Sequence, residues 1–199
     1  MKTDLYSAIK ERRSIYGISK ELVISDERIQ EVIEQALLHT PSAFNAQSGR
    51  IVLLLGTQHD KLWDITKETL RKIVPPENFP QTEERINSFR NGYGSVLFFE
   101  DQGVIEGLQA QFALYKDNFP VWSQHSSGML QYVVWTSLEA EGLGASLQHY
   151  NPLIDEEVKQ VWGIPEKWKL IAQMPFGKPT SPAGEKEFKP VEERLKVVK

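Results

Sequence analysis

The stretch Ser126–Asn151, SSGMLQYVVWTSLEAEGLGASLQHYN, decides the predicted fold. We expect a helix to begin at Ser126 or Ser127, because a serine hydroxyl can accept a hydrogen bond from a free N–H of the first helical turn. Apolar side chains then follow in nearly every direction, and no Lys, Arg, Asp or Glu lies between Asp117 and Glu139. A helix that is apolar nearly all round is typically buried. We therefore place it at the centre of the molecule or in a subunit interface.

The second half of the stretch predicts a turn and a short strand. Gly142 and Gly144 are expected to end the helix, as glycine commonly does. Residues 145–149 then form a strand that finishes on polar side chains and could floor a ligand site. The helix is not a membrane span, because Gln131, Thr136 and Ser137 interrupt an apolar run that is already too short.

The composition narrows the class of protein. At 199 residues the chain is expected to form one domain, 1–199, with a sizeable core. The net charge of −4 gives no reason to expect nucleic acid as a partner. The absence of cysteine excludes disulfides and thiolate catalysis. The charged N-terminal segment does not resemble a secretory signal, so a cytoplasmic location is expected.

Hydrophobic periodicity predicts further elements on both sides of the central stretch. One segment, 177–199, is rich in Pro, Gly and Lys and is predicted to be an extended arm that either frays or wraps over a partner subunit. The predicted helices begin at Thr3 or Asp4, at Ser25 or Asp26, and at Thr57 or Asp60, and two short ones cover Thr82–Phe89 and Asp155–Trp162; the predicted strands are Ile51–Leu55, Val96–Phe99 and Trp168–Met174, the last ending at Pro175.

Two polar segments are candidates for ligand binding. Arg12 and Arg13 could simply complement the dipole of the first helix, or bind a phosphate together with Ser14. The loop that carries Ser42, Asn45 and Gln47 is either an ordinary polar turn or a row of donors and acceptors for a ligand.

Familiar catalytic signatures do not occur in the sequence. The four histidines have no metal-ligand spacing, and there is no nucleophile elbow, P-loop or G-x-G-x-x-G motif. The arginines, the amide-rich loop and a lysine-bearing tail suit an organic cofactor with a phosphate and a polar ring, which would carry the chemistry itself.

In these motifs the chain resembles the nitroreductase family of FMN-dependent oxidoreductases over nearly its full length. The matching segments are Arg12-Arg13-Ser14, the loop Pro41-Ser42-Ala43-Phe44-Asn45-Ala46-Gln47 and the turn Gly142-Leu143-Gly144. GYGSVLFFED, WSQHSSGMLQ, LQHYNPLID and QMPFGKP add a closer similarity to the small branch that contains the fatty-acid-repression-mutant proteins of yeast and copper-induced nitroreductases of lactic acid bacteria.

The resemblance implies an α+β fold, a three-layer α/β/α sandwich with a mostly antiparallel central sheet, in an intertwined homodimer that binds FMN at its interface. It implies that Arg12, Arg13, Ser14 and Lys186 hold the phosphate. Ser42, Asn45 and Gln47 would reach the flavin ring from the other subunit, and Leu147, Gln148 and His149 would lie behind the ring. The full implied cofactor-binding set is Arg12, Arg13, Ser14, Tyr16, Pro41, Ser42, Ala43, Asn45, Gln47, Leu147, Gln148, His149 and Lys186.

The implied activity is hydride transfer from NADH or NADPH through FMN to nitroaromatics or quinones by a ping-pong mechanism, in oxidative or metal stress defence. No catalytic side chain is required, because the flavin carries the chemistry. Phe119, Trp122 and Tyr115 are candidates for stacking on the acceptor, with core packing as the alternative. Ala43 and Leu147-Gln148-His149 depart from the family pattern, which motivates a second hypothesis: a flavin-binding regulatory module in lipid or stress signalling. A third hypothesis is a dimer of purely structural purpose.

Overall fold

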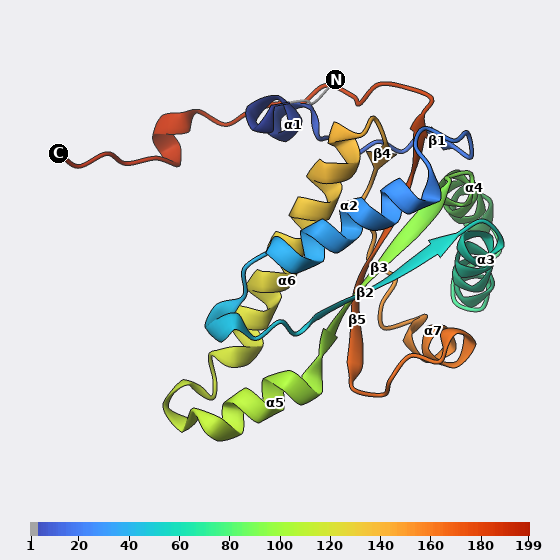
Figure 1. Ribbon diagram of the computed structural model, residues 1–199. Coiled ribbons are helices and arrows are strands. Elements are labelled where there is room, and N and C mark those ends of the chain that lie inside the picture. Colours follow the sequence, from blue (N-terminus) through green and yellow to red (C-terminus); the bar gives the residue numbers. More distant parts are fainter. Residues whose placement is uncertain (1–3) are drawn as a thin grey trace.

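A computed structural model describes residues 4–199 and shows a five-stranded antiparallel sheet (Figure 1). The strand order is β1-β5-β3-β2, and β4 pairs with β5 beside this path. The strands are β1 (Ile18–Ser19), β2 (Gly49–Leu55), β3 (Gly94–Asp101), β4 (Gly144–Ala145) and β5 (Trp168–Pro179).

Helices cover both faces of the sheet (Figure 1). The first face carries α2 (Asp26–His39) and α6 (Phe119–Ala140), and the second carries α3 (Thr57–Arg71), α4 (Phe79–Arg90) and α7 (Asp155–Trp162). Two further helices, α1 (Leu5–Glu11) and α5 (Gln102–Gln111), lie at opposite ends of the layer that contains α6. The predicted α/β/α sandwich is therefore confirmed.

The central strand β3 explains the two cores. Its side chains alternate between the faces, as the pleat of a strand requires: Val96 and Phe98 join the core under α2 and α6, whereas Leu97 and Phe99 join the core under α3, α4 and α7. All four are almost completely buried, which is why this stretch lacks the polar alternation of a solvent-facing strand.

Helix α6 begins seven residues earlier than predicted. Its first residue is Phe119, and Pro120 follows in the first turn, where the missing N–H of proline costs nothing. Ser126 does not cap the helix, because its hydroxyl donates to the carbonyl oxygen of Trp122 at 3.0 Å. Gly142 follows the last turn with a positive φ of 84°, as predicted for the end of the helix. Gly144, by contrast, belongs to β4.

One face of α6 remains uncovered in the single chain. Met129 and Tyr132 are about two-fifths exposed, whereas Leu130, Val134 and Leu138 are buried in the core. The helix is thus not buried all round within one protomer, and Met129 and Tyr132 form an exposed stripe on it.

The two predicted strands near the end of the chain have different bounds. In place of a strand over 145–149 there is the two-residue β4 and a single bridge between Gln148 and Gln173. Pro175 does not end β5, which continues to Pro179. A proline removes only a donor, and the carbonyl oxygen of Pro175 still accepts a hydrogen bond from the backbone N–H of Ser146 at 3.3 Å.

The other predicted elements occur where expected, with small shifts. Ser25 caps α2 by accepting from the N–H of Arg28, Asp4 caps α1, and α7 has the predicted bounds; Thr3 lies outside the described residues. After Pro179 the arm is exposed and contains only one short 3-10 turn, Val191–Glu193. Across the described residues, no helix has the length and hydrophobicity that a bilayer crossing requires.

Candidate functional site

The predicted site residues form two groups beside different parts of α6 (Figure 1). The first group surrounds the end of α1, near the C-terminal half of α6, and includes the start of the arm. The second group is the loop 41–47, near the N-terminal half of α6.

Arg12 is the central residue of the first group. It is the C-cap of α1, and its guanidinium lies over the rings of Trp135 and Tyr132, 4.3 Å and 5.7 Å from their centroids. Its Nε is buried without a hydrogen-bond partner, and no carboxylate among residues 4–199 forms a salt bridge with it. An arginine held by aromatic packing and left without an acid is available to an anion.

Backbone pairing brings Ser14 beside the glycine turn. Ser14 forms a parallel bridge with Ala145, and the N–H of Ile15 donates to the carbonyl oxygen of Ala145 at 3.0 Å. This approach requires glycine at position 144, because a Cβ there would lie 2.8 Å from Cγ2 of Ile15. The predicted Gly-Leu-Gly motif therefore positions the segment that follows the arginines.

The C-terminal arm joins the same group through Arg13. The Arg13 guanidinium donates to the carbonyl oxygen of Gly184 at 2.7 Å, which links two segments from opposite ends of the chain. Lys186 is two residues farther along the arm, exposed, with its Nζ 5.1 Å from the centroid of Phe188. Tyr16 is half exposed, and the guanidinium of Arg85 lies 5.9 Å from the centroid of its ring.

The loop 41–47 has an unusual backbone conformation. Phe44, Asn45 and Gln47 have φ values of 56°, 51° and 47°, a left-handed region that residues other than glycine seldom adopt. Two interactions hold the loop in this shape: Ser42 Oγ accepts from the N–H of Gln47 at 2.9 Å, and Arg50 donates to the carbonyl oxygen of Gln47 at 2.6 Å. Such retained strain is typical of functional loops.

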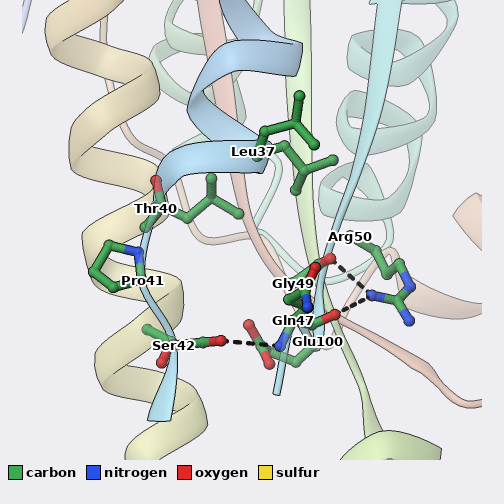
Figure 2. Close-up of a pocket in the computed structure, with 11 residues that line it drawn as sticks. Leu37, Thr40, Pro41, Ser42, Gln47, Gly49, Arg50 and Glu100 are labelled. Atoms are coloured by element: carbon green, nitrogen blue, oxygen red, sulfur yellow. Dashed lines mark hydrogen bonds between the residues drawn. The ribbon is translucent and has the colours of Figure 1, made fainter. Parts of the chain in front are cut away.

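A cavity of about 220 Å³ lies behind this loop (Figure 2). Pro41, Ser42 and Gln47 form one wall, and apolar residues of α2 and α6 form another. The lining residues are Leu37, Leu38, Thr40, Pro41, Ser42, Gln47, Gly49, Arg50, Glu100, Ser126 and Leu130.

Glu100 was not predicted as a site residue, yet it lies at this cavity and is 1% exposed. One carboxyl oxygen, Oε2, accepts from the hydroxyl of Ser48 at 2.7 Å. Burial raises the pKa of Glu100, while the Ser48 hydroxyl and the charge of Arg50 oppose that rise. The signal in the sequence was an acidic residue directly after a wholly apolar strand, VLFF.

Phe44 is the second residue that the sequence reasoning missed. Its ring packs against those of Phe112, Tyr115, Phe119 and Trp122, with centroid separations of 5.0–5.8 Å, and lies nearly parallel to Trp122. Phe119 is buried, whereas Trp122 is half-buried and Tyr115 is 44% exposed. The loop thus inserts an aromatic side chain among the three predicted ones.

An open hollow of about 420 Å³ lies against this aromatic cluster. Phe44 and Trp122 line it together with Met129 and His125, and its walls are almost entirely apolar. Such a surface can stack a planar aromatic compound.

The predicted backing residues do not meet the loop within one chain. Gln148 is buried and exchanges backbone hydrogen bonds with Gln173, while its side chain donates to Ser146 Oγ at 3.0 Å. Leu147 packs against the core under α6, and His149 is exposed.

The geometry divides the predicted site into a cationic part and an amide-rich part. Ser126, at the loop cavity, and Trp135, under Arg12, are separated by about 13 Å along α6, given the rise per residue of an α-helix. Arg12, whose Nε is unpaired, Arg13 and Ser14 suit a phosphate. The loop 41–47 suits the polar edge of a ring. The donor set therefore fits a phosphorylated ring cofactor, provided that both parts can reach it.

Comparisons with known proteins point to one family. Residues 9–178 match the family model described as "Nitroreductase family". Two Saccharomyces cerevisiae proteins are similar: HBN1, which is named as a nitroreductase, is 40% identical over 180 residues (89% of each chain), and nitroreductase FRM2 is 35% identical over 185 residues (92% of this chain and 91% of FRM2). The structures of nitroreductase CinD from Lactococcus lactis in complex with chloramphenicol, 4-nitrophenol and nicotinic acid cover 98% of this chain and 100% of CinD, at 43–45% identity and TM-scores of 0.91, 0.90 and 0.87.

Proposed function

Because the chain belongs to the nitroreductase family of oxidoreductases, we propose that it is an FMN-dependent enzyme that oxidises NADH or NADPH and reduces nitroaromatic compounds or quinones. The observation that carries this proposal is the pairing of a free cationic group around Arg12 with a strained, amide-rich loop. FMN supplies reversible two-electron chemistry when bound, so the protein has to bind, orient and shield.

We assign the phosphate of FMN to Arg12, Arg13 and Ser14. Arg12 has no competing carboxylate among the described residues, and its Nε lacks a partner. Arg13 binds the arm at Gly184, two residues before Lys186, so this lysine belongs to a segment that is tied to the same group. A guanidinium pair with a hydroxyl offers the directed donors that a phosphate prefers.

We assign the polar edge of the flavin ring to the loop 41–47. The hydroxyl of Ser42 accepts from Gln47 and remains free to donate, and the side chain of Asn45 is exposed. Donors near this edge stabilise negative charge that develops during reduction.

The two parts reach one cofactor in a homodimer, in which the loop of each subunit completes the phosphate group of the other. Three features of the single chain support this arrangement. The two groups lie beside different halves of α6, the Met129 and Tyr132 face of that helix is uncovered, and the arm 177–199 extends with apolar side chains such as Phe188 exposed.

The aromatic cluster is the proposed site of the electron acceptor. Phe44 and Trp122 offer a nearly parallel ring pair beside an apolar hollow. Of the three compounds in the CinD complexes, chloramphenicol and 4-nitrophenol are nitroaromatics, and nicotinic acid has the pyridine ring of nicotinamide, the part of NADH that carries the hydride.

Anaerobic spectroscopy tests the proposal. Protein purified with FMN should lose its flavin absorbance when NADH or NADPH is added, and regain it with a quinone or 4-nitrophenol. A protein that binds FMN but is not reduced by either nucleotide would contradict the enzymatic proposal and favour the flavin-binding regulatory module. A protein that binds no FMN would contradict the enzyme and the regulatory module alike, and would favour the hypothesis of a dimer with a purely structural purpose.

A further inference from the structure

Glu100 has a carboxyl oxygen that accepts no hydrogen bond from the described residues. The side chain is 1% exposed at the end of β3. Ser48 satisfies Oε2, but Oε1 is shielded from solvent and has no hydrogen-bond partner within residues 4–199. Because an unpaired buried carboxyl oxygen costs free energy, its presence calls for a partner that the protein chain does not supply.

Arg50, the cation whose charge acts on Glu100, already has other partners. Arg50 donates to the carbonyl oxygens of Gln47 and Gly49 and forms a salt bridge with Asp101 at 3.0 Å. Glu100 itself forms no salt bridge with any residue from 4 to 199. Arg50 thus fixes the base of the loop, and Oε1 of Glu100 has neither a hydrogen bond nor a salt bridge within residues 4–199.

The position of Glu100 indicates what that partner looks like. Figure 2 shows its carboxyl group turned toward the side of the cavity that Ser42 and Gln47 line. The cavity volume of about 220 Å³ is enough for one planar ring, since cavities of about 150 Å³ accept benzene. Leu37 and Leu130 supply apolar walls for the faces of such a ring.

We propose that Glu100 is a specificity-determining residue, whose Oε1 accepts a hydrogen bond from an amide or imide N–H at the edge of a planar heterocycle. The carbonyl beside that N–H would accept from the free hydroxyl of Ser42. Ser48 is the positioning residue, because it holds the other carboxyl oxygen. The inference rests on the proposed function, since the flavin imide and the nicotinamide carboxamide both carry this N–H and C=O pair.

Flavin titrations test whether the N–H that binds Glu100 belongs to FMN. Protein freed of FMN is titrated with FMN and with FMN methylated at the imide nitrogen, and fluorescence quenching gives both affinities. In the wild type, methylation should weaken binding roughly 10- to 100-fold, the range for a hydrogen bond to a charged group. Glu100→Met, which fills the volume without an acceptor, should bind both flavins equally, and Glu100→Gln should restore the preference through its amide oxygen.

Steady-state kinetics with NADH test whether the N–H belongs to the nicotinamide instead. With FMN bound, the KM for NADH is compared with the KM for its 3-acetylpyridine analogue, which lacks the amide N–H. If Glu100→Met abolishes the preference for NADH but leaves the flavin preference intact, the partner is the nicotinamide.

The proposal is overturned if a folded Glu100→Met protein still prefers FMN to its methylated form and NADH to its analogue, each by the same factor as the wild type. If the Met variant does not fold, the wild type and Glu100→Gln decide: equal binding of FMN and its methylated form, together with equal KM values for NADH and its analogue, overturns it. Failure of the proposed function looks different, because wild-type protein would then bind no FMN or would not be reduced by NADH or NADPH.

Discussion

The guanidinium of Arg12 lies 4.3 Å from the centroid of the Trp135 ring, so the first helix of the fold is anchored to α6 at the residue assigned to the cofactor phosphate. This cation–π contact orients the side chain without neutralising it. The proposed phosphate binding and the packing of α1 therefore depend on the same residue.

Replacing Arg12 by alanine should weaken FMN binding roughly 10- to 100-fold, because a charge-assisted contact to the phosphate is lost. Fluorescence titration measures this change. Lys61→Ala, which removes one positive charge from an exposed position of α3 on the other face of the sheet, should bind FMN like the wild type. Equal affinities in Arg12→Ala and the wild type would remove the phosphate assignment.

Replacing Gly144 by alanine should lower the free energy of unfolding by about 1–3 kcal/mol, the usual range for overpacking. The added methyl group would meet Ile15 at 2.8 Å and Pro179 at 3.1 Å, and it would displace Ser14 and weaken FMN binding. Gly107→Ala is the matched control, because a Cβ at this exposed position of α5 has no neighbour within 4 Å. Urea denaturation should show a gain of about 0.5–1 kcal/mol for the control.

The stability of the protein should fall between pH 6.5 and pH 4 because of His59. This side chain is fully buried between Ser95 and the carbonyl oxygen of Arg90, and burial lowers its pKa from 6.5 to about 4. Since the unfolded state binds the proton more readily in this window, protonation favours unfolding as the pH falls. The accumulated loss is about 3 kcal/mol at pH 4.

Urea denaturation across this pH range provides the measurement. In His59→Gln the free energy of unfolding should depend less on pH than in the wild type. In His39→Gln, at an exposed site at the end of α2, it should change with pH as in the wild type. The same slope in His59→Gln and the wild type would show that another group controls the acid sensitivity.

Replacing Phe44 by leucine should raise the KM for 4-nitrophenol about 2- to 10-fold, in line with the loss of one aromatic pair. The affinity for FMN should change little, because the Phe44 ring faces the aromatic cluster. Leu114→Ala, at a highly exposed residue near the cluster, serves as the control in steady-state assays. An unchanged KM in Phe44→Leu would move the acceptor away from this cluster.

The sequence predicted elements well where local signals and burial agreed. Ser25 capped α2 as expected, and the apolar run after Gly94 became the central strand. The start of α6 differs from the prediction because the serine cap signal at Ser126 lies inside the helix, whereas Pro120, six residues earlier, marks the true first turn.

The candidate site was predictable in its polar residues but not in its geometry. Motifs predict Arg12 and the loop as site residues, but no local signal predicts that Phe44 adopts a left-handed backbone and enters the aromatic cluster. Glu100 was missed because composition does not reveal which carboxylate is buried with an unpaired oxygen. Such features depend on contacts between segments far apart in the chain.

The most direct test of the account uses mixed dimers that contain one Arg12→Ala subunit and one Asn45→Ala subunit, purified through two different affinity tags. If each cofactor site takes its phosphate group from one subunit and its loop from the other, one of the two sites carries both substitutions and the second carries neither. Equilibrium titration should then show one FMN per dimer bound with wild-type affinity. If every site of the mixed dimer binds FMN as weakly as the single variants do, the shared site is contradicted.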